Sequence, residues 1–169
     1  PAYIISPLEG IRNYLLPTEG IEVLTAQPDD LAAIKDVCTK ADVVIVIAGT
    51  TYADEGEYIG DFKIRDRSNP DKKNFVVHAG ILGLGGDRKY LHLHSNDIAL
   101  INTAASVNSK VVVSLVAGSA ITVEEWYEKV PAILQIFYNG MEGGTALARI
   151  LFGDVNPSGK LPFTVPKSD

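Results

Sequence analysis

Three acidic side chains crowd a short segment near the end of the first third of this 169-residue chain. Asp54, Glu55 and Glu57 fall within four positions, shortly after an apolar run that ends near Ala48. Crowding and partial enclosure of carboxylates raise at least one pKa, because like charges and desolvation both favour the protonated acid. A carboxyl group that is protonated near neutral pH can donate its proton to a leaving group. The residue types alone favour a blander interpretation, a solvated acidic turn.

A glycine-rich stretch at residues 80–86 invites comparison with phosphate-binding loops. The stretch does not fit G-x-G-x-x-G, follows no obvious strand and contains no Gly-Lys-Ser/Thr. Asp87 and Arg88 come next, where a phosphate site would need the start of a helix. The glycines therefore predict a tight or mobile loop, and they do not support a dinucleotide site.

The histidines, serines and single cysteine offer weaker cases for chemistry. His92 and His94 could share one face of a strand, but no nearby carboxylate offers a third metal ligand, so a polar surface role is favoured. Ser114 and Ser119 lie in no G-x-S-x-G segment, so serine hydrolysis has no support. Cys38 is the only cysteine, which excludes an internal disulfide and a cysteine-ligated cluster.

Strand-like and helix-like patterns alternate around these residues. Continuous β-branched runs at 43–48 and 111–116 predict strands that are covered on both faces. Residues 21–24, 132–137 and 160–165 are further candidate strands. This alternation predicts an α/β fold, a three-layer αβα sandwich with a mainly parallel sheet of about six strands and helices on both faces.

Capping residues mark where the helices should begin. Ser6 at an N-cap, Pro7 at the first helical position and Glu9 three residues on form a capping box. An acidic pair and a serine are similar start signals, and a glycine after the last helix fits a C′ position. The other expected helices are those from Asp29-Asp30 to about Lys40, from Ser95 to about Ala105, and from Gly144 to Phe152 before Gly153.

One stretch breaks the alternation. Residues 58–86 show no clean periodicity, and their charged first part gives way to the glycines. A loop of this length inside a compact domain is usually functional or mobile, and ligands of open α/β sheets bind beyond the carboxyl ends of strands. We therefore interpret residues 1–169 as a single domain with a long irregular active-site loop at 49–88.

The bulk composition excludes several classes of function. Hydrophobic residues make up 46% and charged residues 21%, as in ordinary globular proteins. A net charge of −6 argues against a broad nucleic-acid-binding surface, and no apolar run is long enough to predict a membrane span. The start at Pro1, without Met or a signal segment, suggests an excised or processed piece. Secreted, periplasmic and cytoplasmic locations all stay open.

A series of short segments along the chain carries a family resemblance. The segments are SPLEGI at 6–11, ADVVIV at 41–46, DEGE at 54–57, GDRKYL at 86–91, VVVSL at 111–115, EGGTALA at 142–148 and LFGDVNPSGKLPFT at 151–164. In this order they resemble the C-terminal α/β sandwich domain of family 3 glycoside hydrolases. The last run is the most specific, and the resemblance covers nearly the whole chain.

The resemblance implies retaining exo-hydrolysis of β-linked sugars, most often terminal β-D-glucosyl residues, without a cofactor. It implies a nucleophilic Asp in a barrel domain of the same polypeptide and, in many members, an acid/base Glu in the sandwich domain. Glu57 is the best match to that Glu, because residues 56–59 (GEYI) resemble the family's Gly-Glu-Gly-Tyr-Ile. Glu55 is the fallback, since it aligns in members without a gap.

The chain departs from the family pattern around this acid. Tyr58 stands where the family commonly has Gly, and the spacing to Asp87 and Arg88 is longer than in most members. Asp54, Tyr58, Asp87 and Arg88 are candidates for substrate contact or for pinning the loop, and an Asp87–Arg88 ion pair favours pinning. Glu142 is interpreted as a helix-start residue at the positive end of the helix dipole, not as a catalytic group.

Three readings of function follow. The first is a catalytic domain whose partners are a β-linked glucoside or oligosaccharide and the barrel domain that carries the nucleophile. The second is a non-catalytic sugar-binding or interface domain of the same family, with the acid supplied elsewhere. The third is a doubly wound module that binds a small ligand. A homodimer stays open, and no nucleic-acid or membrane partner is expected.

Overall fold

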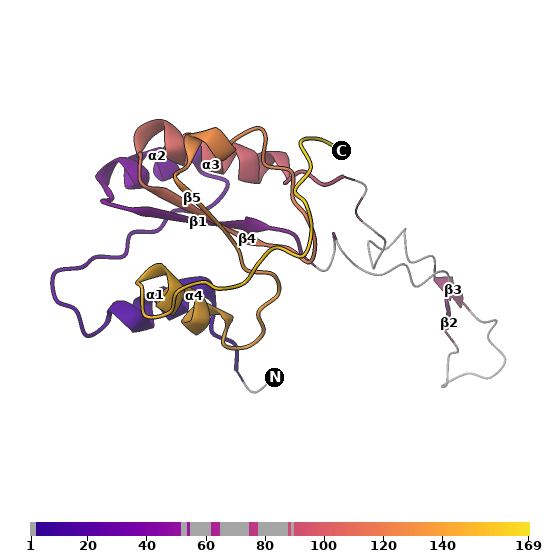
Figure 1. Cartoon of the computed structure of the whole chain (residues 1–169), viewed down its shortest axis with the longest axis horizontal. Coiled ribbons are helices and arrows are strands. Elements are labelled where there is room, and N and C mark those ends of the chain that lie inside the picture. Colours follow the sequence, from indigo (N-terminus) through magenta and orange to yellow (C-terminus); the bar gives the residue numbers. More distant parts are fainter. Residues whose placement is uncertain (1–2, 52–53, 55–61, 65–74, 78–87, 89) are drawn as a thin grey trace. The chain divides into compact units, whose positions relative to one another are not determined.

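A computed structural model of the chain describes residues 3–51, 54, 62–64, 75–77, 88 and 90–169 (Figure 1). The chain divides into two compact units, one formed by Pro1–Gly49 with His92–Asp169 and the other by Thr50–Leu91. The first unit contains a parallel sheet and helices. The second contains a short antiparallel hairpin. The sequence interpretation placed a loop at 49–88 in nearly the same range as the second unit.

The first unit is built on a parallel sheet with the strand order β1-β4-β5. These strands are β1 (Val44–Gly49), β4 (Val111–Val116) and β5 (Ala132–Gln135). In the register of the sheet, Val46 pairs with Val113 and Val113 pairs with Ile133. The central strand β4 is almost wholly buried, as its uninterrupted β-branched sequence predicts.

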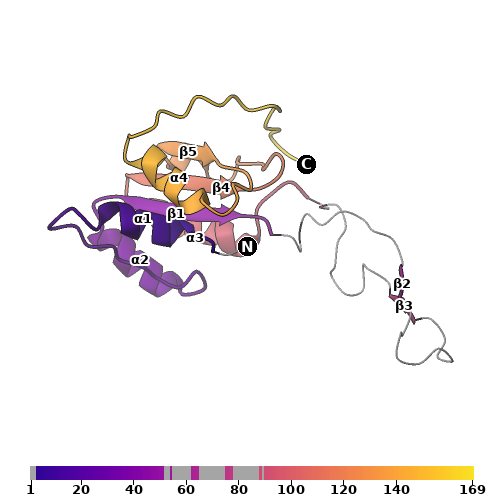
Figure 2. The same ribbon diagram turned by 90° about the horizontal axis from the view of Figure 1, so that it is seen from below.

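Helices cover both faces of this sheet. In Figure 1, α2 (Leu31–Lys40) and α3 (Ser95–Val107) lie over one face, and α1 (Pro7–Leu15) and α4 (Gly143–Leu151) lie over the other. The view from below in Figure 2 has α1 and α4 in front of the strands. The predicted α/β class, a mainly parallel sheet between two helical layers, is confirmed.

The hydrophobic core lies between the sheet and the α2–α3 layer. Ile101 of α3 and Val113 of β4 are completely buried, and Trp126, just before a short 3-10 helix (Tyr127–Lys129), is 1% exposed. Burying one large apolar side chain contributes about 1.5–3 kcal/mol, so these residues hold α3 against the strands. Cys38 belongs to the same cluster, where it packs as a small apolar side chain.

The predicted helix starts are confirmed where the cap is local. The Ser6 Oγ accepts a hydrogen bond from the Glu9 N–H at 3.2 Å, and the Asp30 Oδ1 accepts one from the Ala33 N–H at 2.9 Å. The third start is shifted by one residue, because Ser95 is the first residue of α3 and His94 occupies the N-cap position.

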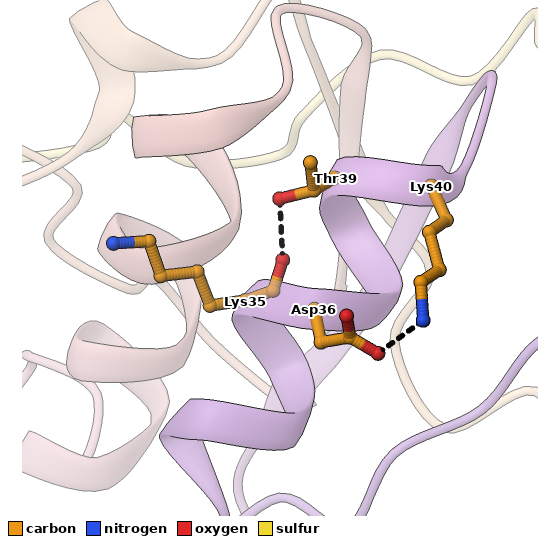
Figure 3. A network of polar contacts seen from close by, with 4 residues as sticks. All are labelled: Lys35, Asp36, Thr39 and Lys40. Atoms are coloured by element: carbon orange, nitrogen blue, oxygen red, sulfur yellow. Dashed lines mark hydrogen bonds and ion pairs between the residues drawn. The ribbon is translucent and has the colours of Figure 1, made fainter.

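The outer face of α2 carries a small polar network (Figure 3). The Thr39 hydroxyl donates to the Lys35 carbonyl oxygen at 2.7 Å, and the Lys40 ammonium lies 2.6 Å from the Asp36 carboxylate. Both charged side chains are about 60% exposed (62% and 60%), so the pair contributes well under about 1 kcal/mol. The network stabilises a solvent-facing helix surface, and it does not form a binding site.

The helices α1 and α4 cross with almost no separation at two glycines. A Cβ added to Gly10 would lie 2.1 Å from the Gly144 carbonyl carbon, and one added to Gly144 would lie 2.1 Å from the Ser6 carbonyl oxygen. Two backbone hydrogen bonds fix the approach, from Ile5 N–H to the Met141 carbonyl at 2.8 Å and from Gly144 N–H to the Ile5 carbonyl at 3.0 Å. Only glycine allows this contact.

Two expected strands do not form. Residues 21–24 and 160–165 have strand-like composition but no strand assignment in the structure, so these two predictions are wrong. The reason is physical: a strand exists only with a partner, and composition alone does not provide one. The strand predicted at 132–137 ends at Gln135, two residues before Phe137, whose φ of 52° is incompatible with a ladder.

A hairpin lies inside the stretch that the sequence treats as irregular. Strands β2 (Phe62–Ile64) and β3 (Phe75–Val77) pair antiparallel, with Phe62 opposite Val77 and Ile64 opposite Phe75. Each strand is three residues long, too short for its alternation to stand out among the surrounding charges. The description of residues 58–86 as lacking regular structure is therefore corrected at these positions.

Candidate active site

The carboxyl ends of the parallel strands define where a site is expected. The strands β1, β4 and β5 run in the same direction, so their carboxyl ends meet at one edge of the sheet. β1 ends at Gly49, where an added Cβ would lie 1.9 Å from the Val116 carbonyl oxygen of β4. The chain therefore leaves the sheet, toward the acidic segment, through a position that only glycine can occupy.

At the same edge, the chain that leaves β5 is held in an unusual conformation. Phe137 has a φ of 52°, which is rare for a bulky residue, and its ring meets Phe163 edge-to-face at a centroid distance of 6.1 Å. Beside it, the Gln135 side-chain amide donates to the Ala117 carbonyl oxygen at 3.0 Å, which ties the ends of β4 and β5 together. The sequence carries no local signal for this conformation, so Phe137 was not among the predicted site residues.

A tight turn forms at the base of the acidic segment. The Asp54 Oδ2 accepts hydrogen bonds from the Thr51 N–H at 2.8 Å and the Thr51 hydroxyl at 2.9 Å. The Asp54 N–H in turn donates to the Thr51 carbonyl oxygen at 3.0 Å. This reciprocal pattern is typical of an aspartate that orders a turn. Asp54 was a candidate for substrate contact or loop pinning, and that choice stays a prediction.

The other site candidates fall mostly outside the described residues. Glu57, its fallback Glu55, Tyr58 and Asp87 all lie outside that part of the chain. Arg88 is described and half-buried, and its predicted ion pair with Asp87 stays a prediction because Asp87 lies outside the described residues. The acid/base assignment to Glu57 therefore stays a prediction.

The Glu142 carboxylate makes structural contacts at the start of α4. Glu142 occupies the N-cap position of α4, and its Oε1 accepts a hydrogen bond from the Tyr3 hydroxyl at 2.6 Å. This bond, with a second from Thr145, lowers the pKa of Glu142 below its ordinary value, and the same contact raises the pKa of Tyr3. A carboxyl group with a lowered pKa is ionised near neutral pH and is a poor proton donor. The helix-start interpretation of Glu142 is confirmed.

Two further side chains of the described region that could carry chemistry are buried. Ser114 is fully buried within β4, so its hydroxyl is inaccessible to a substrate. Burial raises the pKa of the Cys38 thiol, which keeps it protonated and unreactive. Within the described ranges, no group of three or more His, Cys, Asp or Glu side chains could hold a metal ion. None of the helices in those ranges is both long and apolar enough to cross a membrane.

Comparison with known proteins decides the family. Residues 1–169 match the family described as the glycosyl hydrolase family 3 C-terminal domain. The chain belongs to this family. A β-glucosidase from Wickerhamomyces anomalus is 32% identical over 168 residues, which cover 98% of this chain and 18% of that protein. A β-xylosidase from Formosa agariphila is 25% identical over 176 residues, covering 99% of this chain and 20% of that protein.

Solved structures agree with this assignment. The β-D-glucoside glucohydrolase of Trichoderma reesei superimposes with a TM-score of 0.76 at 28% sequence identity, over 98% of this chain and 20% of that one. The family 3 domain therefore spans about a fifth of the length of these relatives. It is a glycoside hydrolase domain, and the activity of a whole protein is a separate question.

The fold explains several of the motif segments of this family 3 domain. The SPLEGI segment supplies the cap, the first turn and the crossing glycine of α1, and the EGGTALA segment supplies the corresponding part of α4. The LFGDVNPSGKLPFT run begins where α4 ends: the Tyr14 hydroxyl donates to Asp154 at 2.7 Å, and the Tyr14 ring stacks on Phe152 at 4.7 Å. These segments build the α1–α4 layer.

Proposed function

We propose that this family 3 domain supplies the general acid/base of a retaining, exo-acting β-glycosidase, and that Glu57 is the acid/base residue. The preferred substrate in this proposal is a terminal β-D-glucosyl residue. The observation that carries the proposal is the position of the acidic segment, which directly follows the Thr51–Asp54 turn at the end of β1 in a chain of this family.

Elimination among the carboxyl groups supports this choice. Glu142 lies in another family motif, but its hydrogen bonds with Tyr3 and Thr145 keep it ionised. Asp54 accepts two hydrogen bonds from Thr51 and orders the turn. Glu55 and Glu57 are the remaining acids of the DEGE segment, and the GEYI match favours Glu57.

The chemistry requires a second carboxyl group from outside this chain's recognised motifs. A retaining glycosidase places its nucleophile and its acid/base about 5–5.5 Å apart on opposite sides of the scissile bond. In the proposal, Glu57 protonates the departing oxygen while an Asp of a barrel domain of the same polypeptide attacks the anomeric carbon. The ionised Glu57 then takes a proton from the water that hydrolyses the glycosyl-enzyme intermediate.

The leaving group provides the test. In the full-length enzyme, we expect Glu57→Gln to lower kcat/KM by about 10²–10⁴-fold on an alkyl or disaccharide β-glucoside, whose leaving group must be protonated. On a dinitrophenyl β-glucoside, which departs without protonation, the same variant should retain nearly full kcat/KM. Glu55→Gln is the matched control, with the same change of charge two residues away.

The two variants separate the alternatives. An equal loss on both substrates for Glu57→Gln would contradict an acid role, and a leaving-group-dependent loss for Glu55→Gln alone would move that role to Glu55. If neither variant depends on the leaving group, the domain forms a sugar-binding wall or an interface and the acid lies elsewhere.

The preference for glucose is a separate part of the proposal. The relatives named above include a β-glucosidase and a β-xylosidase. Glucose and xylose differ in the group that is attached to C5 of the sugar ring. We expect kcat/KM on an aryl β-glucoside to exceed that on the matching β-xyloside by at least about tenfold. A reversed ratio would reject the glucose preference and leave the acid/base assignment untouched.

A further inference from the structure

The sheet of the first unit has a mainly apolar slot along its β1 edge. The slot has a volume of about 780 Å³ and is lined by β1, by the segment that connects α1 to α2 and by side chains of both helical layers. Leu8 and Ile11 of α1 line it from one face of the sheet, and Ile34 of α2 lines it from the other. The slot therefore lies in the sheet layer itself, beside β1.

Several large apolar side chains in the walls of the slot are exposed. Ile21 and Leu24 on one side and Val43 and Ile47 on the other are 52%, 38%, 53% and 37% exposed. Native interiors hold few voids larger than a water molecule, and large exposed apolar patches mark surfaces that another group covers. The connecting segment, which resembles a strand in composition, does not pair with β1 and leaves the slot open.

The backbone of β1 specifies what kind of group fits. Among the described strands, β4 is the only one paired with β1, and the Val44 N–H donates to the Lys110 carbonyl across that side. Because the N–H and C=O groups of successive residues alternate in direction, Val44 and Val46 bond toward β4, and Ile45 and Ile47 direct theirs into the slot. The slot lies in the sheet layer, has mainly apolar walls and is bordered by backbone donors and acceptors of β1. These three features together fit a β-strand as the bound group.

We propose that an apolar β-strand from the same polypeptide, outside residues 1–169, inserts into the slot and pairs with Ile45 and Ile47 of β1. The chain spans only 18–20% of the length of the relatives above, so such a protein has ample chain to supply this strand. A second copy fits poorly, because its own β1 edge is flanked by the same helices and connecting segment and cannot enter the slot.

Amide exchange in the full-length protein tests the pairing, with β4-facing positions as an internal control. We expect the amides of Ile45 and Ile47 to exchange within about tenfold of the rates at Val44 and Val46. Exchange at Ile45 and Ile47 that is faster by more than roughly a hundredfold would mean an open edge and would overturn the proposal.

A proline pair gives an independent readout in the same protein. Proline is tolerated on an open strand edge but not where its N–H would enter a ladder. We expect I45P and V46P to lower Tm by similar amounts, since each removes a ladder hydrogen bond. A normal Tm for I45P beside a large drop for V46P would overturn the proposal.

The occupant is identified by photo-crosslinking from position 24, with p-benzoylphenylalanine replacing Leu24 in the full-length protein. The expected product is an intramolecular crosslink to an apolar segment outside residues 1–169. Crosslinks that appear only in covalent dimers would assign the slot to a second copy, and crosslinks only to residues within 1–169 would assign it to this domain's own chain. Either result would overturn the proposal.

Discussion

Two regions of this domain carry motifs of the same family, but the motif residues make different kinds of contact in each region. At the α1–α4 crossing, motif residues meet through backbone atoms and leave no room for a side chain at Gly10 or Gly144. In the segment after β1, motif residues are carboxylates, and Asp54 is held by hydrogen bonds from Thr51. Motif membership therefore does not indicate a shared role, because the crossing depends on the absence of side chains and the segment after β1 presents charged ones.

The crossing should respond most strongly to a single methyl group. Gly144→Ala places a Cβ against the Ser6 carbonyl oxygen, where backbone cannot move aside cheaply. We expect a loss of about 3 kcal/mol or more in the free energy of unfolding, measured by denaturant titration of the full-length protein. Gly159→Ala is the matched control, since nothing lies within 4 Å of its Cβ, and it should be close to neutral. Similar losses of unfolding free energy for the two variants would contradict the claim that the crossing has no room for a side chain.

A substitution in the turn after β1 should lower stability less than Gly144→Ala does, and it should also lower catalytic activity. Asp54→Ala removes the acceptor of two hydrogen bonds from Thr51, which we expect to cost about 1 kcal/mol, as for the loss of a capping aspartate. In the full-length enzyme, we expect kcat/KM to fall with little change in leaving-group dependence, because our proposal gives the proton donation to Glu57 and leaves Asp54 the ordering of the turn before it. Asp54→Asn retains an acceptor oxygen and should recover most of the activity. A leaving-group dependence equal to that of Glu57→Gln would contradict this division of roles.

The Tyr3–Glu142 contact should give the smallest effect and a defined pH dependence. The hydrogen bond lowers the pKa of Glu142 from its ordinary value of 4.5, so the folded state binds its proton less tightly than the unfolded state does. The stabilisation is therefore present above about pH 4.5 and is lost as the pH falls through the lowered pKa.

Tyr3→Phe should reduce Tm slightly at pH 7, and the difference from wild type should shrink progressively in acid. Thermal unfolding at a series of pH values measures this difference. A pH-independent difference would mean that the hydroxyl contributes through packing and not through the carboxylate. Activity should not change, in contrast with the acidic segment.

Features that depend on neighbours in sequence were predictable, and features that depend on partners far along the chain were not. Ser6 and Asp30 mark their helices because each cap bonds a backbone N–H three residues away. Residues 21–24 look as strand-like as parts of the sheet but have no partner strand among the described residues, and composition could not reveal this. Gly10 and Gly144 lie more than a hundred positions apart in the sequence. The sequence shows both glycines but does not reveal that they contact each other.

The same distinction between local and distant features applies to the candidate site. That an acidic segment follows a buried strand could be predicted from residue types and from the rule for parallel sheets. Which carboxyl group meets the substrate depends on a nucleophile that the recognised motifs of this chain do not include. The φ of 52° at Phe137 also escaped prediction, and its ring contacts Phe163, a residue far along the chain.

The most direct measurement of the central claim is rescue of Glu57→Gly by azide in the full-length enzyme. With a dinitrophenyl β-glucoside the glycosyl-enzyme intermediate still forms, but its hydrolysis lacks a general base. Azide attacks without one, so we predict a turnover rate that rises with azide concentration and a β-glucosyl azide product with retained configuration. A rate unchanged by azide, with glucose as the sole product, would contradict the assignment of Glu57 as the acid/base.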